Sequence, residues 1–296
     1  MEPRERKSIH IGESCAFADG PAVGPISTGQ RQRANELGWR FTSLDAAMSP
    51  ERQVEHLARL IEVGVDAITS FTLDATLAEP VYLRIAAASI PLVTFGSASP
   101  SAAVTVRQHV DSALCGADAV EYIARRVPRA RVLVVGGPPI PALAARTRHF
   151  LEAAARADLE VVAHEDNVGD VERTARPIVK RLLELHPQVD AIWCFNDYTA
   201  LAAAAELARR GIPARSSKRG GVIVSGIGGI PRAIDAIRNG RMTFTYDSRP
   251  VDVGRTAMDL IERMIVGEER PPREVWIDFT RCDLENVNDY VPWEEC

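Results

Sequence analysis

Residues 190–212, DAIWCFNDYTALAAAAELARRGI, decide how this chain is expected to fold. The run AIWCF is short and continuously apolar, which is typical of a strand buried on both faces of a parallel sheet. Asn196 and Asp197 follow it directly, and the alanine- and leucine-rich residues after them predict a helix. Asn and Asp both cap helices well, and the rim where a parallel strand ends is also where such sheets bind ligands. The stretch therefore predicts a strand, a capped helix and a candidate binding position at their junction.

The same strand-then-helix unit recurs along the whole chain. Apolar runs predict strands at residues 8–12, 40–46, 65–71, 90–95, 130–137, 160–164, 190–195, 220–226, 242–247 and 274–279. Helical patterns predict helices at about residues 26–37, 49–64, 75–88, 112–126, 142–157, 170–185, 197–210, 230–239 and 251–266. Most of the strands are continuous apolar runs, so the expected fold class is α/β, with parallel sheets covered on both faces. At 296 residues the chain is long enough for two such domains.

Composition and charge argue against several classes of protein. The net charge is −5 and the only basic run is short, at residues 4–7, so a nucleic-acid surface is not indicated. No apolar stretch approaches the roughly 18 residues that cross a bilayer. The first apolar run is reached by Ile9 with no signal-peptide core before it. We therefore expect either a cytoplasmic protein or one whose export signal has been removed.

The spacing of cysteines and histidines predicts no metal site. The five cysteines contain no C-x-x-C pair, and the six histidines contain no H-x-x-x-H or H-E-x-x-H pattern. Cys115 and Cys194 lie in apolar segments and are expected to be small core residues. A disulfide between Cys282 and Cys296 is left open for the case of an oxidising compartment.

Catalytic motifs are missing as well. The glycine cluster VSGIGGIP at residues 224–231 follows a predicted strand, but Pro231 occupies the third glycine position of a dinucleotide fingerprint. Ser225 does not lie between the two glycines of a nucleophile elbow, and there is no G-x-x-x-x-G-K-[ST] phosphate loop. We therefore expect no cofactor and no enzymatic activity, and an enzyme on this α/β scaffold is only the third alternative.

Several stretches occur together in an order that resembles a known family over essentially the full chain. They are LIEVGVDAI (60–68), SIPLVTF (89–95), AARTRHFLEA (144–153), the opening stretch, residues 221–261, and DLENVNDYV (283–291). The chain resembles the type I periplasmic binding proteins, the group of ribose- and galactose-binding proteins that also supplies the effector domains of lactose-repressor-type regulators. The N-D-x-x-A-L block followed by G-x-x-x-x-P and P-x-x-x-G is specific when the three occur together.

The resemblance implies a particular domain organisation. It predicts two Rossmann-like lobes with parallel sheets, joined by three strands that cross near Asp111, Asp247 and Trp276. The N-terminal lobe would comprise residues 1–111 and 248–276, and the C-terminal lobe residues 112–247 and 277–296. A small polar ligand would be held in the cleft between the lobes, which close on it by a hinge motion.

The resemblance also implies a function, with one alternative. We expect the solute-binding protein of an ABC importer, monomeric and periplasmic or membrane-associated outside the cell, that binds a sugar-like molecule or sugar acid and is recognised by the transporter permease. The alternative is the effector domain of a lactose-repressor-type regulator that lacks its DNA-binding segment, which would be cytoplasmic. Only about eight residues precede Ile9, too few for a helix-turn-helix domain, which favours the importer.

The family's ligand-binding positions can be carried over one at a time. Arg146 matches the arginine of the R-x-x-G-F motif, and Asn196 the asparagine that binds ligand hydroxyls, while Asp197 is expected to cap the following helix. Phe71 and Tyr198 would add aromatic surface, although such residues are more often core. Replacing Arg146 or Asn196 by Ala is expected to weaken binding and to leave the melting temperature nearly unchanged.

Three other positions depart from the family pattern. Gly228 stands where an acidic residue is usual, Ser248 where glutamine is usual, and Gly96, beside Ser97, where a second acid is usual. We nevertheless expect Gly228, Ser248 and Ser97 to border the ligand. Since strong hydroxyl partners are lost, a simple sugar bound in the usual way is not favoured. The expected ligand is larger, less hydroxylated, or carries an anionic group that faces Arg146.

Overall fold

The computed structural model describes residues 8–20, 23–215 and 220–291, which form two compact units. The first unit comprises residues 1–107 and 250–277, and the second comprises residues 108–249 and 278–296. The chain passes from one unit to the other three times, after Arg107, Arg249 and Ile277. The expected lobe boundaries differ from these by at most four residues (111 against 107).

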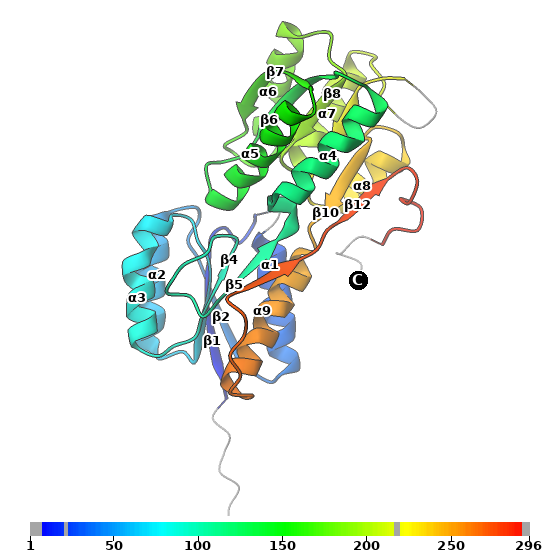
Figure 1. Cartoon of the computed structure of the whole chain (residues 1–296). Coiled ribbons are helices and arrows are strands. Elements are labelled where there is room, and N and C mark those ends of the chain that lie inside the picture. Colours follow the sequence, from blue (N-terminus) through cyan, green and yellow to red (C-terminus); the bar gives the residue numbers. More distant parts are fainter. Residues whose placement is uncertain (1–7, 21–22, 216–219, 292–296) are drawn as a thin grey trace, which may run out of the picture. The chain divides into compact units, whose positions relative to one another are not determined.

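The first unit is a six-stranded sheet between two pairs of helices (Figure 1). The sheet order is β11-β5-β4-β3-β1-β2. Its strands are β1 (His10–Cys15), β2 (Arg40–Asp45), β3 (Ala67–Phe71), β4 (Leu92–Phe95), β5 (Val104–Gln108) and β11 (Glu274–Ile277). Its helices are α1 (Val23–Glu36), α2 (Pro50–Val63), α3 (Ala75–Ala87) and α9 (Pro250–Ile265). Helices α2 and α3 cover one face of the sheet, and α1 and α9 pack together on the other.

Two glycines allow α1 and α9 to pack closely. A Cβ added to Gly29 would lie 2.1 Å from the carbonyl oxygen of Val251, and one added to Gly254 would lie 2.1 Å from that of Ile26. Such contacts are far inside van der Waals distance, so each helix requires a glycine where the other crosses it.

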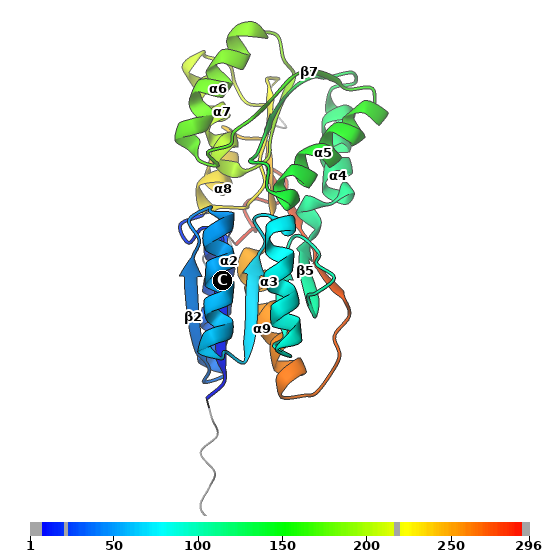
Figure 2. The ribbon, with the colours of Figure 1, turned by 90° about the vertical axis from the view of Figure 1, so that its left-hand side faces the viewer.

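The second unit repeats this architecture with a different edge (Figure 2). The sheet order is β12-β10-β9-β8-β6-β7. Its strands are β6 (Arg131–Gly136), β7 (Glu160–Asp166), β8 (Ala191–Cys194), β9 (Ile223–Ser225), β10 (Phe244–Asp247) and β12 (Thr280–Asp283). Its helices are α4 (Ala113–Arg126), α5 (Pro141–Arg156), α6 (Glu172–Leu185), α7 (Asp197–Arg209) and α8 (Pro231–Arg238), with a short 3₁₀ helix η1 (His109–Asp111) before α4. Helices α4 and α5 lie on one side, and α6, α7 and α8 on the other.

The small side chains of α7 explain the alanine-rich stretch from which the fold was predicted. Ala200, Ala203 and Ala204 are buried and lie in one hydrophobic core with Ile192 and Cys194 of β8. Because alanine brings the helix close to the sheet without losing side-chain entropy, this face of α7 packs tightly.

The expected α/β fold class is confirmed, with corrections at the strands. The four pairs β6–β7, β6–β8, β8–β9 and β9–β10 are parallel, whereas β10 and β12 pair antiparallel. The strand expected at residues 274–279 is present as β11, which ends at Ile277 and belongs to the first sheet, whereas β12 of the second sheet was not expected. Strand β5 was not expected, and β1 extends to Cys15 rather than ending at residue 12.

The described ranges contain no helix that is long and apolar enough to cross a membrane. Within the same ranges, no group of three or more His, Cys, Asp and Glu side chains is arranged to hold a metal ion. Cys15, Cys115, Cys194 and Cys282 are buried free thiols. Cys296 lies outside the described residues, so its pairing with Cys282, left open by the sequence, is not tested.

Candidate ligand-binding site

The candidate site lies at the carboxyl edge of the second unit's sheet. Strands β6, β8, β9 and β10 run parallel, so the residues that follow them reach the same edge. Asn196 follows β8, Gly228 follows β9, and Gly228 forms an isolated bridge with Asp247 at the end of β10. Three of the predicted positions, Asn196, Gly228 and Ser248, are therefore brought to one edge by the topology.

Arg146 reaches this edge from α5, where it is buried and already bonded. Its Nε and Nη2 lie 2.8 and 2.7 Å from Oδ1 of Asp111, on η1, and its Nη1 donates to the carbonyl oxygen of Phe195 at 2.6 Å. The Arg146 side chain is 6% exposed and that of Asp111 13%. The positive charge of the guanidinium is thus compensated within the unit, because Asp111 supplies the opposite charge.

Asn196, and not Asp197, is the N-cap of α7. The Asn196 Oδ1 accepts a hydrogen bond from the backbone N–H of Thr199 at 2.8 Å, and Asn196 has the extended backbone of a cap. The expectation that Asp197 caps the helix is therefore wrong, since Asp197 is already the first helical residue. Its side chain points to other elements instead.

Asp197 is fully buried and anchors the glycine-rich loop after β9. Its Oδ2 accepts the backbone N–H of Ile230 at 3.0 Å and its Oδ1 accepts the hydroxyl of Thr245 at 2.5 Å. A Cβ on Gly226 would lie 2.3 Å from the Asp197 carboxylate, and one on Gly228 3.0 Å from it. Burial raises the pKa of Asp197 to about 6, against the lowering effect of these hydrogen bonds. The glycine cluster therefore wraps a buried carboxylate.

Gly228 also has a backbone that excludes the acid usual in the family. Its φ is +147°, a region that residues with a side chain rarely adopt. A carboxylate at this position would in addition face Asp197. The departure from the family pattern is thus built into the loop.

Two acidic residues that complete this edge were not among the predicted site residues. Asp111 was expected only as a crossing point, and Asp170 only as the start of a helix, which in fact begins at Glu172. Asp170 lies between β7 and α6, and its Oδ1 accepts a hydrogen bond from Nδ2 of Asn196 at 2.6 Å. Burial raises its pKa to about 6, while Arg146 and the bond from Asn196 lower it. Local sequence gives little signal for either contact.

Ser248, at the same edge, and the remaining predicted residues make other contacts. Ser248 is buried and its carbonyl oxygen accepts a hydrogen bond from Nε2 of Gln108 at 2.6 Å. Tyr198 is half-buried and packs against the hydrophobic core of the second unit. Phe71 and Ser97 belong to the first unit, at the carboxyl ends of β3 and β4. Their roles as ligand contacts stay predictions.

Comparison with known proteins gives the family. A model described as "Periplasmic binding protein domain" matches residues 18–269. The chain belongs to the periplasmic binding protein family. It is 24% identical over 254 residues to the ribose import binding protein RbsB of Salmonella typhimurium, covering 85% of this chain and 83% of that protein. It is 23% identical over 266 residues to RbsB of Bacillus subtilis, covering 89% and 84%.

Solved structures support the same fold for this periplasmic binding protein. A Caulobacter myo-inositol binding protein bound to myo-inositol has a TM-score of 0.86 at 18% identity, with 98% of each chain covered. An ABC transporter solute binding protein from Bacillus halodurans C-125 with bound myo-inositol has a TM-score of 0.82 at 22% identity, covering 96% of this chain and 97% of that one. Both cover nearly the whole chain, so the likeness extends to both units.

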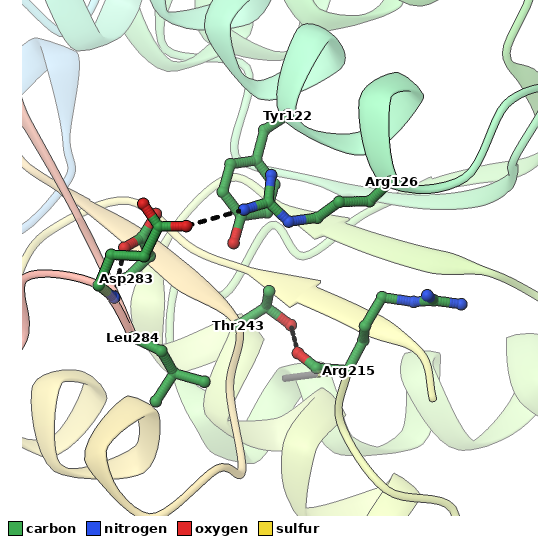
Figure 3. Close-up of a pocket in the computed structure, with 7 residues that line it drawn as sticks. Tyr122, Arg126, Arg215, Thr243, Asp283 and Leu284 are labelled. Carbon is green, nitrogen blue, oxygen red and sulfur yellow. Dashed lines mark hydrogen bonds and ion pairs between the residues drawn. The ribbon is translucent and has the colours of Figure 1, made fainter. Parts of the chain in front are cut away.

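One hollow in the second unit of this periplasmic binding protein lies away from the candidate site (Figure 3). It has a volume of ≈ 200 Å³ and is lined by Tyr122, Arg126, Arg215, Thr243, Asp283, Leu284 and Glu285. Thr243 directly precedes β10, so the hollow lies at the amino end of that strand, whereas Asp247 marks the carboxyl end. Arg126 lies against the ring of Tyr122 and pairs with Glu285 at 3.5 Å. The hollow is therefore separate from Arg146 and Asn196.

Proposed function

We propose that this protein is the solute-binding component of an ABC importer and that its ligand is a sugar or a sugar-like polyol. The observation that carries the proposal is similarity to ribose import binding proteins across 254 residues, 85% of the chain. The alternative, an effector domain of a transcriptional regulator, has no specific observation in its favour.

The chemistry of the second unit's edge suits a hydroxyl-rich ligand. A hydroxyl both donates and accepts, so it needs donors and acceptors close together. The Arg146 guanidinium has five N–H groups, of which three are used in bonds with described residues. The Asp170 carboxylate and the Asn196 amide add acceptors and a further donor beside it. A small polyol would find both kinds of partner here.

The partners and location follow from the same proposal. A solute-binding protein hands its ligand to a membrane permease, and it works outside the cytoplasmic membrane, in the periplasm or attached to the cell surface. It would act as a monomer. The expected cleft between the lobes and its closure on the ligand stay predictions.

A thermal-shift screen followed by calorimetry tests the function. The purified chain is screened against D-ribose, D-allose, myo-inositol and related pentoses, hexoses and polyols. A ligand present at about 1,000 times its Kd should stabilise the native state by about 4 kcal/mol, a shift that such a screen detects readily. A chain that none of these compounds stabilises, and that calorimetry shows to bind none, would contradict the proposal.

A substitution at Asn196 tests the site itself. Serine also caps helices, so Asn196→Ser keeps the bond to the Thr199 N–H and removes only the Nδ2 donor. We expect affinity for the best ligand to fall roughly tenfold, and the lost bond to Asp170 to lower the stability by about 1–3 kcal/mol. Asn239→Ser, at the exposed end of α8, is the matched control and should bind normally. Unchanged affinity in Asn196→Ser would remove Asn196 from the site.

A further inference from the structure

We propose that Asp170 is a specificity-determining residue of this site, whose carboxylate accepts a hydrogen bond from a ligand hydroxyl and excludes sugars that carry an acid group. The inference rests on the proposed function. It adds an acceptor that the family positions Gly96, Gly228 and Ser248 do not supply in this chain.

The position of Asp170 links it to the predicted ligand residues. Its Oδ1 accepts from Nδ2 of Asn196 at 2.6 Å, and the charge of Arg146 acts on it. Its Oδ2 forms no hydrogen bond with any residue in the described ranges. One carboxylate oxygen thus orients Asn196, while the other is available to a ligand at the same edge.

The buried side chain of Asn167 holds the loop that carries Asp170 in place. Asn167 is completely buried, and its Nδ2 donates to the hydroxyl of Thr199 at 3.0 Å while its Oδ1 accepts from that of Thr174 at 2.6 Å. The backbone N–H of Asp170 donates to the carbonyl of Asn167 at 3.2 Å. A carboxylate fixed in this way loses little entropy when it binds a ligand hydroxyl.

The charges of Arg146, Asp111 and Asp170 together favour a neutral ligand over an anionic one. Asp111 already balances the positive charge of Arg146. The three side chains Arg146, Asp111 and Asp170 therefore carry a net negative charge when Asp170 is ionised. Burial raises the pKa of Asp170 only to about 6, so the group is ionised at pH 7.5. An acidic ligand would meet a like charge in a poorly solvated place, which is unfavourable. The anionic group expected to face Arg146 is therefore not favoured.

Calorimetry with matched ligand pairs tests the inference on the full chain at pH 7.5. Each neutral sugar is measured beside an acid derived from it: D-galactose with D-galacturonate, D-glucose with D-glucuronate, and D-ribose with D-ribonate. The readout is the ratio of the two Kd values in the wild type and in Asp170→Asn. Asparagine keeps an acceptor for Asn196 and, like aspartate, tolerates the left-handed backbone of residue 170, with φ at +56°.

Asp158→Asn is the control, because Asp158 has the same φ of +56° but is exposed on the surface. We expect the wild type to bind the neutral member of a pair at least about tenfold more tightly, and Asp170→Asn to reduce that ratio roughly tenfold by weakening the neutral sugar and tolerating the acid. Asp158→Asn should keep the wild-type ratio.

The outcomes separate the inference from the proposed function. A wild type that binds sugars but prefers the acid, or an Asp170→Asn variant with the wild-type ratio, would overturn the role of Asp170 and leave the function standing. A wild type that binds neither member of any pair, nor any compound of the wider screen, would overturn the function, and the inference with it.

Discussion

Replacing Glu13 by glutamine should change how the stability of this protein depends on pH. Glu13 lies inside β1 and is 1% exposed. Its Oε1 accepts hydrogen bonds from the Ser27 hydroxyl and from Nε2 of Gln30, both at 2.7 Å, whereas its buried Oε2 has no hydrogen bond within 3.5 Å among the described residues, and the Ser43 hydroxyl on β2 is its polar neighbour. Burial raises the pKa of this carboxyl, and the neighbouring hydroxyl and amide groups only partly offset it.

The direction of the effect follows from proton binding. Because the folded chain holds the Glu13 proton more tightly than the unfolded chain does, unfolding releases a proton at pH values between the ordinary glutamate pKa, about 4.3, and the raised one. The stability that this proton provides is complete below the ordinary pKa and is lost as the pH rises through the raised one. Within that window the free energy of unfolding should fall by about 1.4 kcal/mol per pH unit for this one group.

Glutamine has nearly the same shape and does not titrate, so Glu13→Gln should lack this contribution. Its amide nitrogen would take the place of Oε2, which has no hydrogen bond within 3.5 Å among the described residues, at a pH-independent cost of about 1–3 kcal/mol. The variant is therefore expected to be less stable than the wild type near pH 4 and to gain on it steadily as the pH rises. The difference between the two should become constant above the raised pKa.

Urea unfolding at half-unit steps from pH 4 to pH 9 measures this difference. Glu55→Gln, an exposed position on α2, is the control for removing one surface carboxylate. If the wild-type and Glu13→Gln curves run parallel over the whole range, Glu13 does not titrate differently in the folded and unfolded chains, and the reasoning from its burial is refuted.

Two further predictions concern packing and charge. Arg146→Ala removes a buried guanidinium from the partly buried carboxylate of Asp111 and should cost about 3–5 kcal/mol. The melting temperature should therefore fall clearly, contrary to what the sequence alone led us to expect. An unchanged melting temperature would mean that the pair does not contribute to the stability of the folded state. Gly254→Ala places a Cβ against the carbonyl of Ile26 and should lower the free energy of unfolding, measured in urea, by about 1–3 kcal/mol. Gly220→Ala is the control, because Gly220 has open space around it, and should lower this free energy little. Equal effects would contradict the close approach of α1 and α9.

The strands that are buried on both faces could be predicted, because burial requires apolar residues throughout such a strand. Strands such as β6 and β8 are covered on both faces, so they are continuous apolar runs that the sequence displays directly. The sequence of β5, VTVRQ, and that of β12, TRCD, carry polar residues, and β12 lies at the edge of its sheet. Their pairing depends on partners far along the chain, and local composition does not contain that information.

The site could be predicted only in part for a similar reason. Arg146 and Asn196 were predicted because they match a family motif. Their partners were not: Asp111 lies 35 residues from Arg146, and Asp170 lies 26 residues from Asn196. The sheet creates each contact by bringing separate loops to one edge. A single sequence does not show which residues of these loops will lie beside one another.

The Asn196–Asp197 pair shows how one junction serves both the fold and the site. The Asn196 Oδ1 caps α7, and its Nδ2 donates a hydrogen bond to Asp170. The cap therefore fixes the orientation of the Asn196 amide, which is the group expected to contact a ligand. Asp197 is buried beneath it and holds the backbone of the loop before α8 through Ile230, and β10 through Thr245. Aspartate could replace Asn196 as a cap but would face Asp170 with a like charge, and asparagine at position 197 would lose the charge that its hydrogen-bond donors stabilise. The order of the two residues is therefore favoured: the amide stands at the cap, where it meets another carboxylate, and the acid stands inside, where the Ile230 N–H and the Thr245 hydroxyl donate to it.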